Sequence, residues 1–313
     1  MKKFLTLLAA SLLAALPVIA ASYQADPDPA DVKMETKTYA YSGFSELQVS
    51  WTYQVALTQA DHYSVRVEAP DFLLPYLDVK VTGNRLVLGI KEMPRDIRKK
   101  VEMVLKHDEI RAWVAMPELA ALQMSGASRL NATGQFAARR FDFKMELSGA
   151  SVLRGLSVAA GDADLRASGA AKFEVLGDFS DLKLTLSGAT TGTLETGKNV
   201  DEADVDLSGA TKLNLSGTFN QLDLDASGAV NLKMSGRLRE LDLTASGAAK
   251  ADLLNIPANE VSVSLSGTAK AELYVQQTLA AKLSGASTCS YKAGPDFRIT
   301  DQTVSRGASL KRL

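Results

Sequence analysis

The stretch Leu222-Asp223-Leu224-Asp225-Ala226-Ser227-Gly228-Ala229 contains the pattern on which most of the chain is built. Apolar and polar residues alternate from Leu222 to Ala226, which is the period of a strand with one buried face. The Ser-Gly-Ala that follows indicates a corner, because glycine adopts positive φ without strain. We therefore expect a short strand that ends at a tight bend.

The same marker returns along the chain at a nearly constant interval. Its serines are Ser125, Ser148, Ser168, Ser187, Ser208, Ser227, Ser246, Ser266 and Ser284, at steps of 18 to 23 residues, with Ser-Gly-Thr at Ser266. A spacing near twenty is typical of a solenoid, in which each repeat stacks on the last. The glycines expected at the corners are Gly126, Gly149, Gly169, Gly188, Gly209, Gly228, Gly247, Gly267 and Gly285.

A second short strand follows each marker, as in Lys212–Leu215 and Asn231–Met234. Further turn signals, such as Ser216-Gly217 and Ser235-Gly236, come next. One such repeat is too small to bury its apolar side chains alone, so the coils must stack. The sequence therefore predicts an all-β fold, a parallel β-helix (solenoid) of about 20-residue coils with an N-terminal β-rich cap region.

Residues 1–20 have the features of a secretory signal peptide. Lys2 and Lys3 precede an apolar run from Phe4 to Leu16, which is shorter than the roughly 20 residues of a membrane span. We expect export to the periplasm, the outer-membrane surface or the medium. The predicted organisation continues with a flexible lead (21–39), the N-terminal β-rich part that caps the solenoid (40–120), the β-helix (121–291) and a C-terminal cap or tail (292–313).

The region before the first marker contains strand signals of its own. A hairpin turning at Gly83-Asn84 is predicted between Val79 and Ile90, after one short helical turn or a bend in Phe72–Leu77. The charged run Arg95–Lys100 is expected to be an exposed loop. Further strands are expected at Glu46–Trp51, Tyr53–Leu57, Tyr63–Glu68, Val101–Leu105 and Ile110–Val114.

Charge and cysteine content exclude several classes of protein. The chain has 35 basic and 36 acidic residues, and without Lys2 and Lys3 the balance is 33 to 36, a net charge of −3. Such a balance gives no electrostatic reason to bind nucleic acid or an anionic membrane. One cysteine, Cys289, permits no internal disulfide. Its spacing from Ser284 matches apolar positions of other coils, so we expect a buried, unreactive thiol.

The N-terminal third resembles a known family. The segments are Val55–Gln59, Tyr63–Ala69, Leu73–Leu77, Val79–Val81 and Gly83–Leu88, followed by Met116–Leu119 and the Ser-Gly-Ala repeats. In this order they resemble the bacterial "putative auto-transporter adhesin, head GIN domain" family over about residues 40–290. The resemblance implies a β-helical fold, an envelope location and relatives among Bacteroidetes-like bacteria. It implies no catalytic residue, and the 23 residues from Tyr291 onward are too few for a membrane barrel.

A cluster of carboxylates is the candidate site. Positions four and two before the marker serines hold Asp204, Asp206, Asp223, Asp225 and Asp242, which stacked coils would bring onto one face. We interpret this acidic face as a solvated surface. Calcium binding is the alternative, because calcium prefers clustered carboxylate oxygens.

No cofactor and no catalytic residue are predicted. His62 and His107 lie in predicted loops without a paired carboxylate motif, and no histidine accompanies the repeated serines. The preferred function is a non-enzymatic adhesin or envelope scaffold that binds glycan or protein through its repeated flat faces. The alternatives are a carbohydrate-active enzyme on the same scaffold and a periplasmic structural or stress factor.

Overall fold

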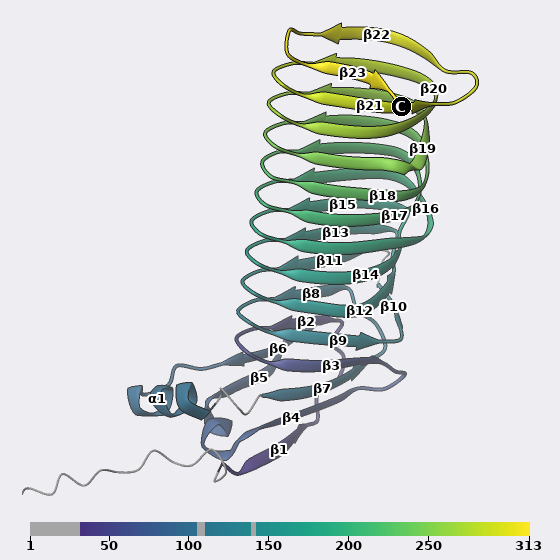
Figure 1. The fold of residues 1–313 in the computed structure, drawn as a ribbon. Coiled ribbons are helices and arrows are strands. Elements are labelled where there is room, and N and C mark those ends of the chain that lie inside the picture. The colour runs from purple at the N-terminus through teal and green to yellow at the C-terminus, as the bar shows by residue number, and fades with distance from the viewer. Residues whose placement is uncertain (1–31, 105–109, 139–141) are drawn as a thin grey trace, which may run out of the picture.

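The protein is a β-solenoid of about nine turns, with coils about 20 residues apart. The coils lie one above another, with the N-terminal strands at one end and the C-terminus at the other (Figure 1). The structure is a computed structural model that describes residues 32–104, 110–138 and 142–313. The predicted signal peptide lies outside the described residues. The all-β parallel β-helix that the marker spacing predicts is confirmed.

Each coil contributes one strand to each of two long walls, which meet at the marker corner. The first wall contains the strands before the corners: β2 (Glu46–Val49), β8 (Ala121–Met124), β11 (Asp142–Leu147), β13 (Asp162–Ala167), β15 (Asp181–Leu186), the second halves of β16 to β20, and β22 (Arg298–Val304). The second wall contains the strands after them: β3 (Gln54–Gln59), β9 (Arg129–Thr133), β12 (Val152–Ala159), β14 (Lys172–Asp178), the first halves of β16 to β20, β21 (Thr288–Ala293) and β23 (Ser309–Arg312).

Five long strands pass from the second wall to the first around the edge opposite the corner. They are β16 (Thr191–Leu207), β17 (Lys212–Ala226), β18 (Asn231–Ala245), β19 (Lys250–Leu265) and β20 (Lys270–Leu283). Pairing between their coils is parallel and keeps equivalent residues of the two walls in register. Asp204 therefore pairs with Asp223, and Asp223 with Asp242.

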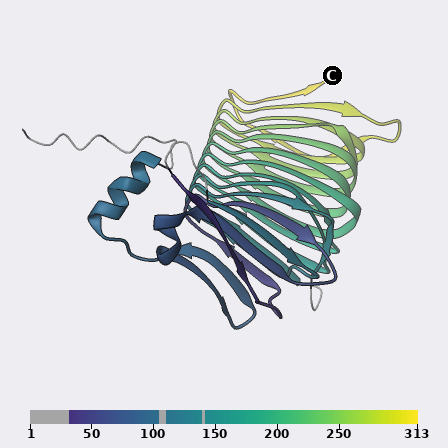
Figure 2. The ribbon, with the colours of Figure 1, turned by 90° about the horizontal axis from the view of Figure 1, so that it is seen from below.

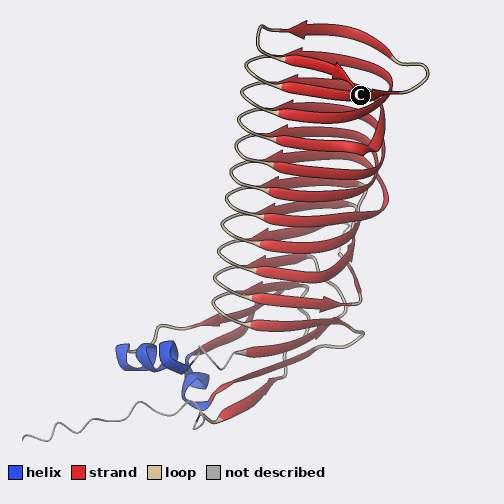
Figure 3. Ribbon diagram, viewed as in Figure 1, coloured by secondary structure: helices blue, strands red, loops and turns tan. Residues whose placement is uncertain are grey.

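The corners form a column of glycines along one edge, where Figure 3 shows the loops of successive coils aligned. All nine predicted corner glycines have positive φ. The amide N of Ala210 donates to the carbonyl O of Gly188 in the coil below, at 2.7 Å. A Cβ on the corner glycines from Gly149 to Gly285 would lie 2.5 to 3.0 Å from a backbone atom of the glycine below. Each corner therefore requires glycine for two reasons, its positive φ and the close packing of its backbone on the coil below.

The interior is a continuous apolar core between the walls. Cys289 is buried there, in the same column as Leu130, Phe173 and Leu213. Burial raises the pKa of the Cys289 thiol to about 12. The expectation that Cys289 is a small core residue is confirmed by its burial. Because a thiol reacts through its thiolate, the raised pKa also lowers its reactivity.

The solenoid begins before the first Ser-Gly-Ala. β2 and β3 pair in parallel with β8 and β9, and the bend between them is at Trp51, which has a φ of +67°. Next to these, antiparallel strands end both walls. On the first wall, β6 (Arg85–Ile90) pairs with β5 (Leu77–Thr82). On the second wall, β7 (Arg111–Met116) pairs with β4 (Ser64–Pro70), and β4 pairs in turn with β1 (Met34–Tyr39). Figure 2 shows these strands from below the coils.

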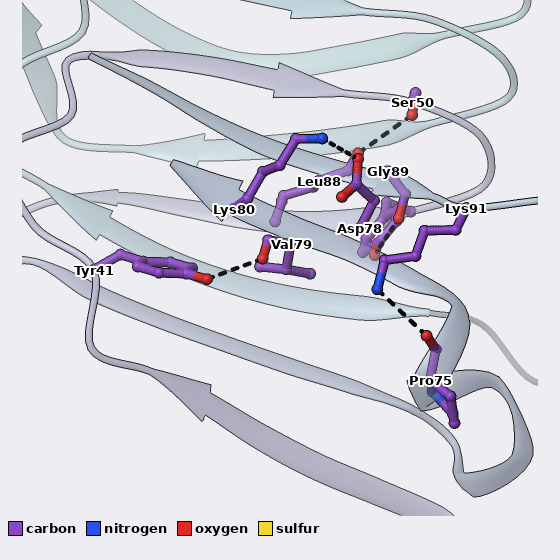
Figure 4. Close-up of polar contacts among 10 residues, drawn as sticks. Tyr41, Ser50, Pro75, Asp78, Val79, Lys80, Leu88, Gly89 and Lys91 are labelled. Carbon is purple, nitrogen blue, oxygen red and sulfur yellow. Dashed lines mark hydrogen bonds and ion pairs between the residues drawn. The ribbon is translucent and has the colours of Figure 1, made fainter. Parts of the chain in front are cut away.

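Polar contacts join the β5–β6 hairpin to the first coil (Figure 4). The hydroxyl of Tyr53 donates to the carbonyl O of Gly89 at 3.1 Å, and burial raises the pKa of this phenol. Tyr41 donates in the same way to the carbonyl O of Val79 at 3.0 Å. The predicted hairpin and the predicted helical turn, a 3-10 helix at Asp71–Tyr76, are both confirmed.

Two predictions for the N-terminal third are wrong. Arg95–Lys100, expected to be a loop, begins the helix α1 (Arg95–Val104), and the strand expected from Val101 is the end of that helix. Ile97 and Val101 lie one turn apart and pack against the core, which stabilises the helix. The segment consists mostly of charged residues, so the helical spacing of its two apolar residues is not evident from the sequence.

The remaining short strand β10 (Gln135–Ala137) pairs in parallel with β12. At the C-terminal end, β22 and β23 continue the two walls in parallel with β20 and β21. Most side chains of β22 are exposed. In the described part of the chain, no antiparallel strand covers this end of the solenoid.

Candidate binding walls

The outward positions of both walls form straight columns, which are defined by their distance from the corner glycine. On each wall the near column lies three residues from that glycine and the far column five residues from it. On the first wall these are the residues two and four before the marker serine. On the second wall they are the residues four and six after it. Neighbouring coils bring equivalent positions about 4.8 Å apart.

The predicted carboxylates do come together on the first wall. Asp204, Asp223 and Asp242 follow one another in the far column, and Asp206 and Asp225 are neighbours in the near column. Partial burial and then the surrounding carboxylates Asp225, Asp242, Asp204 and Asp206 raise the pKa of Asp223. The stack therefore disfavours the charged form of its central member.

The acidic character of this wall extends beyond the predicted residues. A third outward column, seven residues from the corner, is also largely acidic. We call the outward surface of the first wall from β11 to β19 the acidic wall. Its carboxylates are Asp142, Glu146, Asp162, Asp164, Asp181, Glu202, Asp204, Asp206, Asp223, Asp225, Glu240, Asp242 and Glu260.

Two of the basic residues on the acidic wall pair with its carboxylates. Lys183 Nζ lies 2.6 Å from Asp204 Oδ2, and this hydrogen bond raises the pKa of Lys183. Arg166 Nε lies 2.9 Å from Asp164 Oδ1. A shallow depression of about 410 Å³ lies beside these pairs, lined by acidic residues and by Lys144 and Lys183. Among the described residues, no group of three or more His, Cys, Asp or Glu side chains is arranged to hold a metal ion.

The second wall is basic, a feature that the residues before the marker serines do not reveal. Counting forward by four and six finds the signal. We call the outward near and far columns from β9 to β20 the basic wall. Its cations are Arg129, Arg154, Lys172, Lys212, Lys233, Lys250 and Lys270, against Glu174, Asp252 and Glu272. All seven cations are exposed.

The cations of the basic wall are arranged differently from the carboxylates opposite. They are distributed over both columns, so two cations are direct neighbours in one column only at Lys250 and Lys270, and two carboxylates only at Asp252 and Glu272. Within the described ranges, no carboxylate lies within ion-pair distance of any of the seven. They are therefore available to an external anion.

Several marker serines bond to the backbone of the coil below. Ser208 Oγ donates to the carbonyl O of Leu186 in the coil below, at 3.4 Å, and Ser148, Ser168 and Ser284 make equivalent bonds. Their role is in the corner. His62 contacts its neighbour Asp61 at 3.0 Å, and both side chains are exposed.

The geometry defines a repeat protein with two flat, polar and oppositely charged walls. The family model described as "Putative auto-transporter adhesin, head GIN domain" matches residues 43–195 and 183–295. The chain belongs to this family, as the resemblance implied. No curated protein matches the sequence.

Several solved structures are similar to this chain. One, from Parabacteroides merdae and described as "a putative adhesin", has 13% identity and a TM-score of 0.46, with 90% of this chain and 96% of that chain covered. A "putative adhesin" from Parabacteroides distasonis has 15% identity and a TM-score of 0.49, with coverage of 90% and 98%. A "Putative lipid binding protein" from P. distasonis has 14% identity and a TM-score of 0.42, with coverage of 90% and 96%.

Proposed function

We propose that the chain is an exported, non-enzymatic adhesin or envelope scaffold that binds glycan or protein through its walls. One observation carries the proposal: the match to an adhesin family covers residues 43–295, which include both charged walls. Each rung presents an exposed polar strip of the same kind, so an extended partner would make many weak contacts. Such contacts add up when they are held on one rigid body.

Export is supported by the predicted signal peptide at residues 1–20. In the residues that the structure describes, no helix has the length and apolar character needed to cross a bilayer. Fractionation of cells, combined with protease treatment of intact cells, tests the location. Cleavage in intact cells is expected for a surface adhesin. Protection until the outer membrane is opened would instead favour the periplasmic structural or stress factor.

Binding is tested with the purified mature chain on an array of bacterial and host glycans and on envelope proteins. The matched variants remove two charges from one wall each: Lys212→Gln with Lys233→Gln, and Asp225→Asn with Asp242→Asn. We expect one pair to reduce binding several-fold and the other to leave it unchanged. Binding that survives both pairs would show that these four side chains are not part of the site.

An enzyme on the same scaffold is the second candidate, because carboxylates line the depression on the acidic wall. A polysaccharide depolymerisation assay, run beside the array, separates the two. The proposed adhesin gives no turnover. Turnover that Asp164→Ala or Asp204→Ala abolishes, both in that depression, would establish the enzyme in its place.

We further propose that the N-terminal β-rich part caps the solenoid. Two antiparallel strands support this role, because β5 covers the edge of β6 and β4 covers the edge of β7, which would otherwise be free to pair with other chains. β1 pairs in turn with β4, and the hydroxyls of Tyr41 and Tyr53 bond to the β5–β6 hairpin.

A further inference from the structure

The two charged walls belong to one repeat, so their columns have the same spacing. Along the solenoid axis both walls repeat with the rungs, at about 4.8 Å. Across the strands, near and far columns are two residues apart on both walls. A second copy, moved sideways without rotation, brings its basic wall onto the acidic wall of the first. The near column of one copy then faces the near column of the other, and the far column faces the far column, because the columns of both walls are counted from the same corner glycine.

The charges decide the height at which such copies meet. With equal rungs facing, two pairs are complementary, Lys212–Asp206 and Lys233–Asp223, whereas like charges oppose one another at four places. These are Arg154 on Lys144, Lys172 on Arg166, Glu174 on Asp164 and Asp252 on Asp242. This alignment is therefore disfavoured.

A shift by one rung gives a different result, which depends on its direction. A shift toward the previous rung makes four complementary pairs but also opposes Asp252 to Asp223 and Glu272 to Asp242. A shift toward the next rung is more favourable. Each basic strand then faces the acidic strand of the next rung, and the near and far columns contain five complementary pairs. The pairs are Arg129–Glu146, Arg154–Asp164, Glu174–Lys183, Lys212–Asp225 and Lys233–Asp242. In Glu174–Lys183 the carboxylate lies on the basic wall and the cation on the acidic wall. The two walls therefore match residue by residue and not only in net charge. Like charges meet at Lys270–Lys282 and, outside these columns, at Glu195–Glu202.

We propose that copies of this chain associate side by side, the basic wall of one on the acidic wall of the next, with an offset of one rung. Asp225, Asp242, Lys212 and Lys233 have no ion-pair partner among the described residues, so their charges are free to pair across the interface. Arg154 and Glu174 join the existing pairs Asp164–Arg166 and Lys183–Asp204. Because two different walls meet, the contact does not close, and it extends into a row of parallel solenoids.

The walls are exposed and charged, so the association depends on salt. Sedimentation velocity of the mature chain is measured at about 0.01 M and about 1 M salt, where charges are screened over roughly 30 Å and 3 Å. We expect faster-sedimenting species that grow with protein concentration at low salt, and monomer at high salt. A chain that is monomeric at both salt concentrations, or an association that salt does not change, would overturn the proposal.

Charge reversal tests the pairing. Lys212→Glu with Lys233→Glu, and Asp225→Lys with Asp242→Lys, should each abolish association at low salt. A one-to-one mixture of the two double variants should restore it, because each altered wall meets its altered partner. Circular dichroism confirms that the variants fold. A mixture that stays monomeric contradicts the pairing.

Two further arms test the register and the competing partner. Lys172→Glu with Lys250→Glu alters the same wall by the same charge, but these residues face Thr185 and Ser264 under the one-rung offset, so association should remain. Loss of association in this control would refute the offset. Dextran sulfate is the polyanion probe: a wild-type chain that is monomeric yet binds it through the basic wall would show a polyanion site in place of self-association.

Discussion

The chain bends sharply at both edges of the solenoid, but different groups pack inside the two bends. At the marker corner, backbone packs on backbone, glycine over glycine. At the opposite edge, side chains fill the bend, in the buried column Val200, Phe219, Leu238, Ala258 and Val275. Close backbone packing admits one residue type, whereas an apolar filling admits many. The first edge is therefore visible in the sequence as a strict marker, and the second is not.

The largest effect is expected at the side-chain edge. Phe219→Ala removes a buried ring and leaves a cavity, which should lower the free energy of unfolding by about 3–5 kcal/mol in urea denaturation. Phe219→Leu keeps most of the filling and should cost less than about 1.5 kcal/mol. Equal losses in both variants would show that this edge demands one residue, as the corner does.

The corner is tested by Gly209→Ala. Gly209 has a φ of +74°, and the added Cβ would lie 2.6 Å from the carbonyl O of Gly188. Strain of about 1–2 kcal/mol and the crowding together should cost roughly 3 kcal/mol by the same measurement. Gly43 is the control, since it has a φ of +76° and nothing within 4 Å of its Cβ. If Gly43→Ala costs as much, close packing contributes nothing at the corner.

The position two residues after the corner glycine distinguishes hydrogen-bonded from unpartnered hydroxyls. Thr211 Oγ1 donates to the carbonyl O of Ser208 at 2.6 Å, whereas the buried Ser151 Oγ has no partner. Thr211→Val should cost about 1 kcal/mol. Ser151→Ala should be neutral or stabilising, since Ala171 occupies the next position of this column. Denaturation that ranks the two variants in the opposite order would contradict this account.

The smallest effect concerns the acidic wall. The pKa of Asp223 is raised in the folded state, so its charge destabilises the fold above that pKa, and the penalty disappears as the pH falls toward the ordinary value near 4. Asp223→Asn should therefore raise stability near neutral pH, and the gain should shrink on acidification. Asp252→Asn, on the basic wall, is the control and should bring no gain. A gain for Asp223→Asn that is independent of pH would exclude the carboxylate as its cause.

These edges also explain what the sequence could predict. The marker spacing predicts the coils, and the period of two predicts which side chains of Leu222–Ala226 face outward. Column assignment then follows by counting, which brings the acidic residues Asp204 to Asp242 onto one face. The same count in the forward direction predicts the basic wall from Arg129 to Lys270.

Other features depend on contacts between distant segments. Helix α1 forms where two apolar residues of a charged run meet the core, and the antiparallel strands at the N-terminal end follow no repeat. The opposite edge is irregular, with register shifts such as that between Glu195 and Asn199. Its filling depends on the combined volume of several coils, which no single repeat encodes.

Trp51 gives the solenoid a direction. It occupies the corner below Gly126 in the same left-handed conformation, but it carries a side chain where each higher corner has a hydrogen. That side chain projects toward the place of a preceding coil, so an insertion there would collide with an indole. Above it, every boundary joins one glycine corner to another. Whole coils could therefore be duplicated or deleted between Gly126 and Gly285, and rod length could evolve in steps of one repeat while the foundation stays fixed.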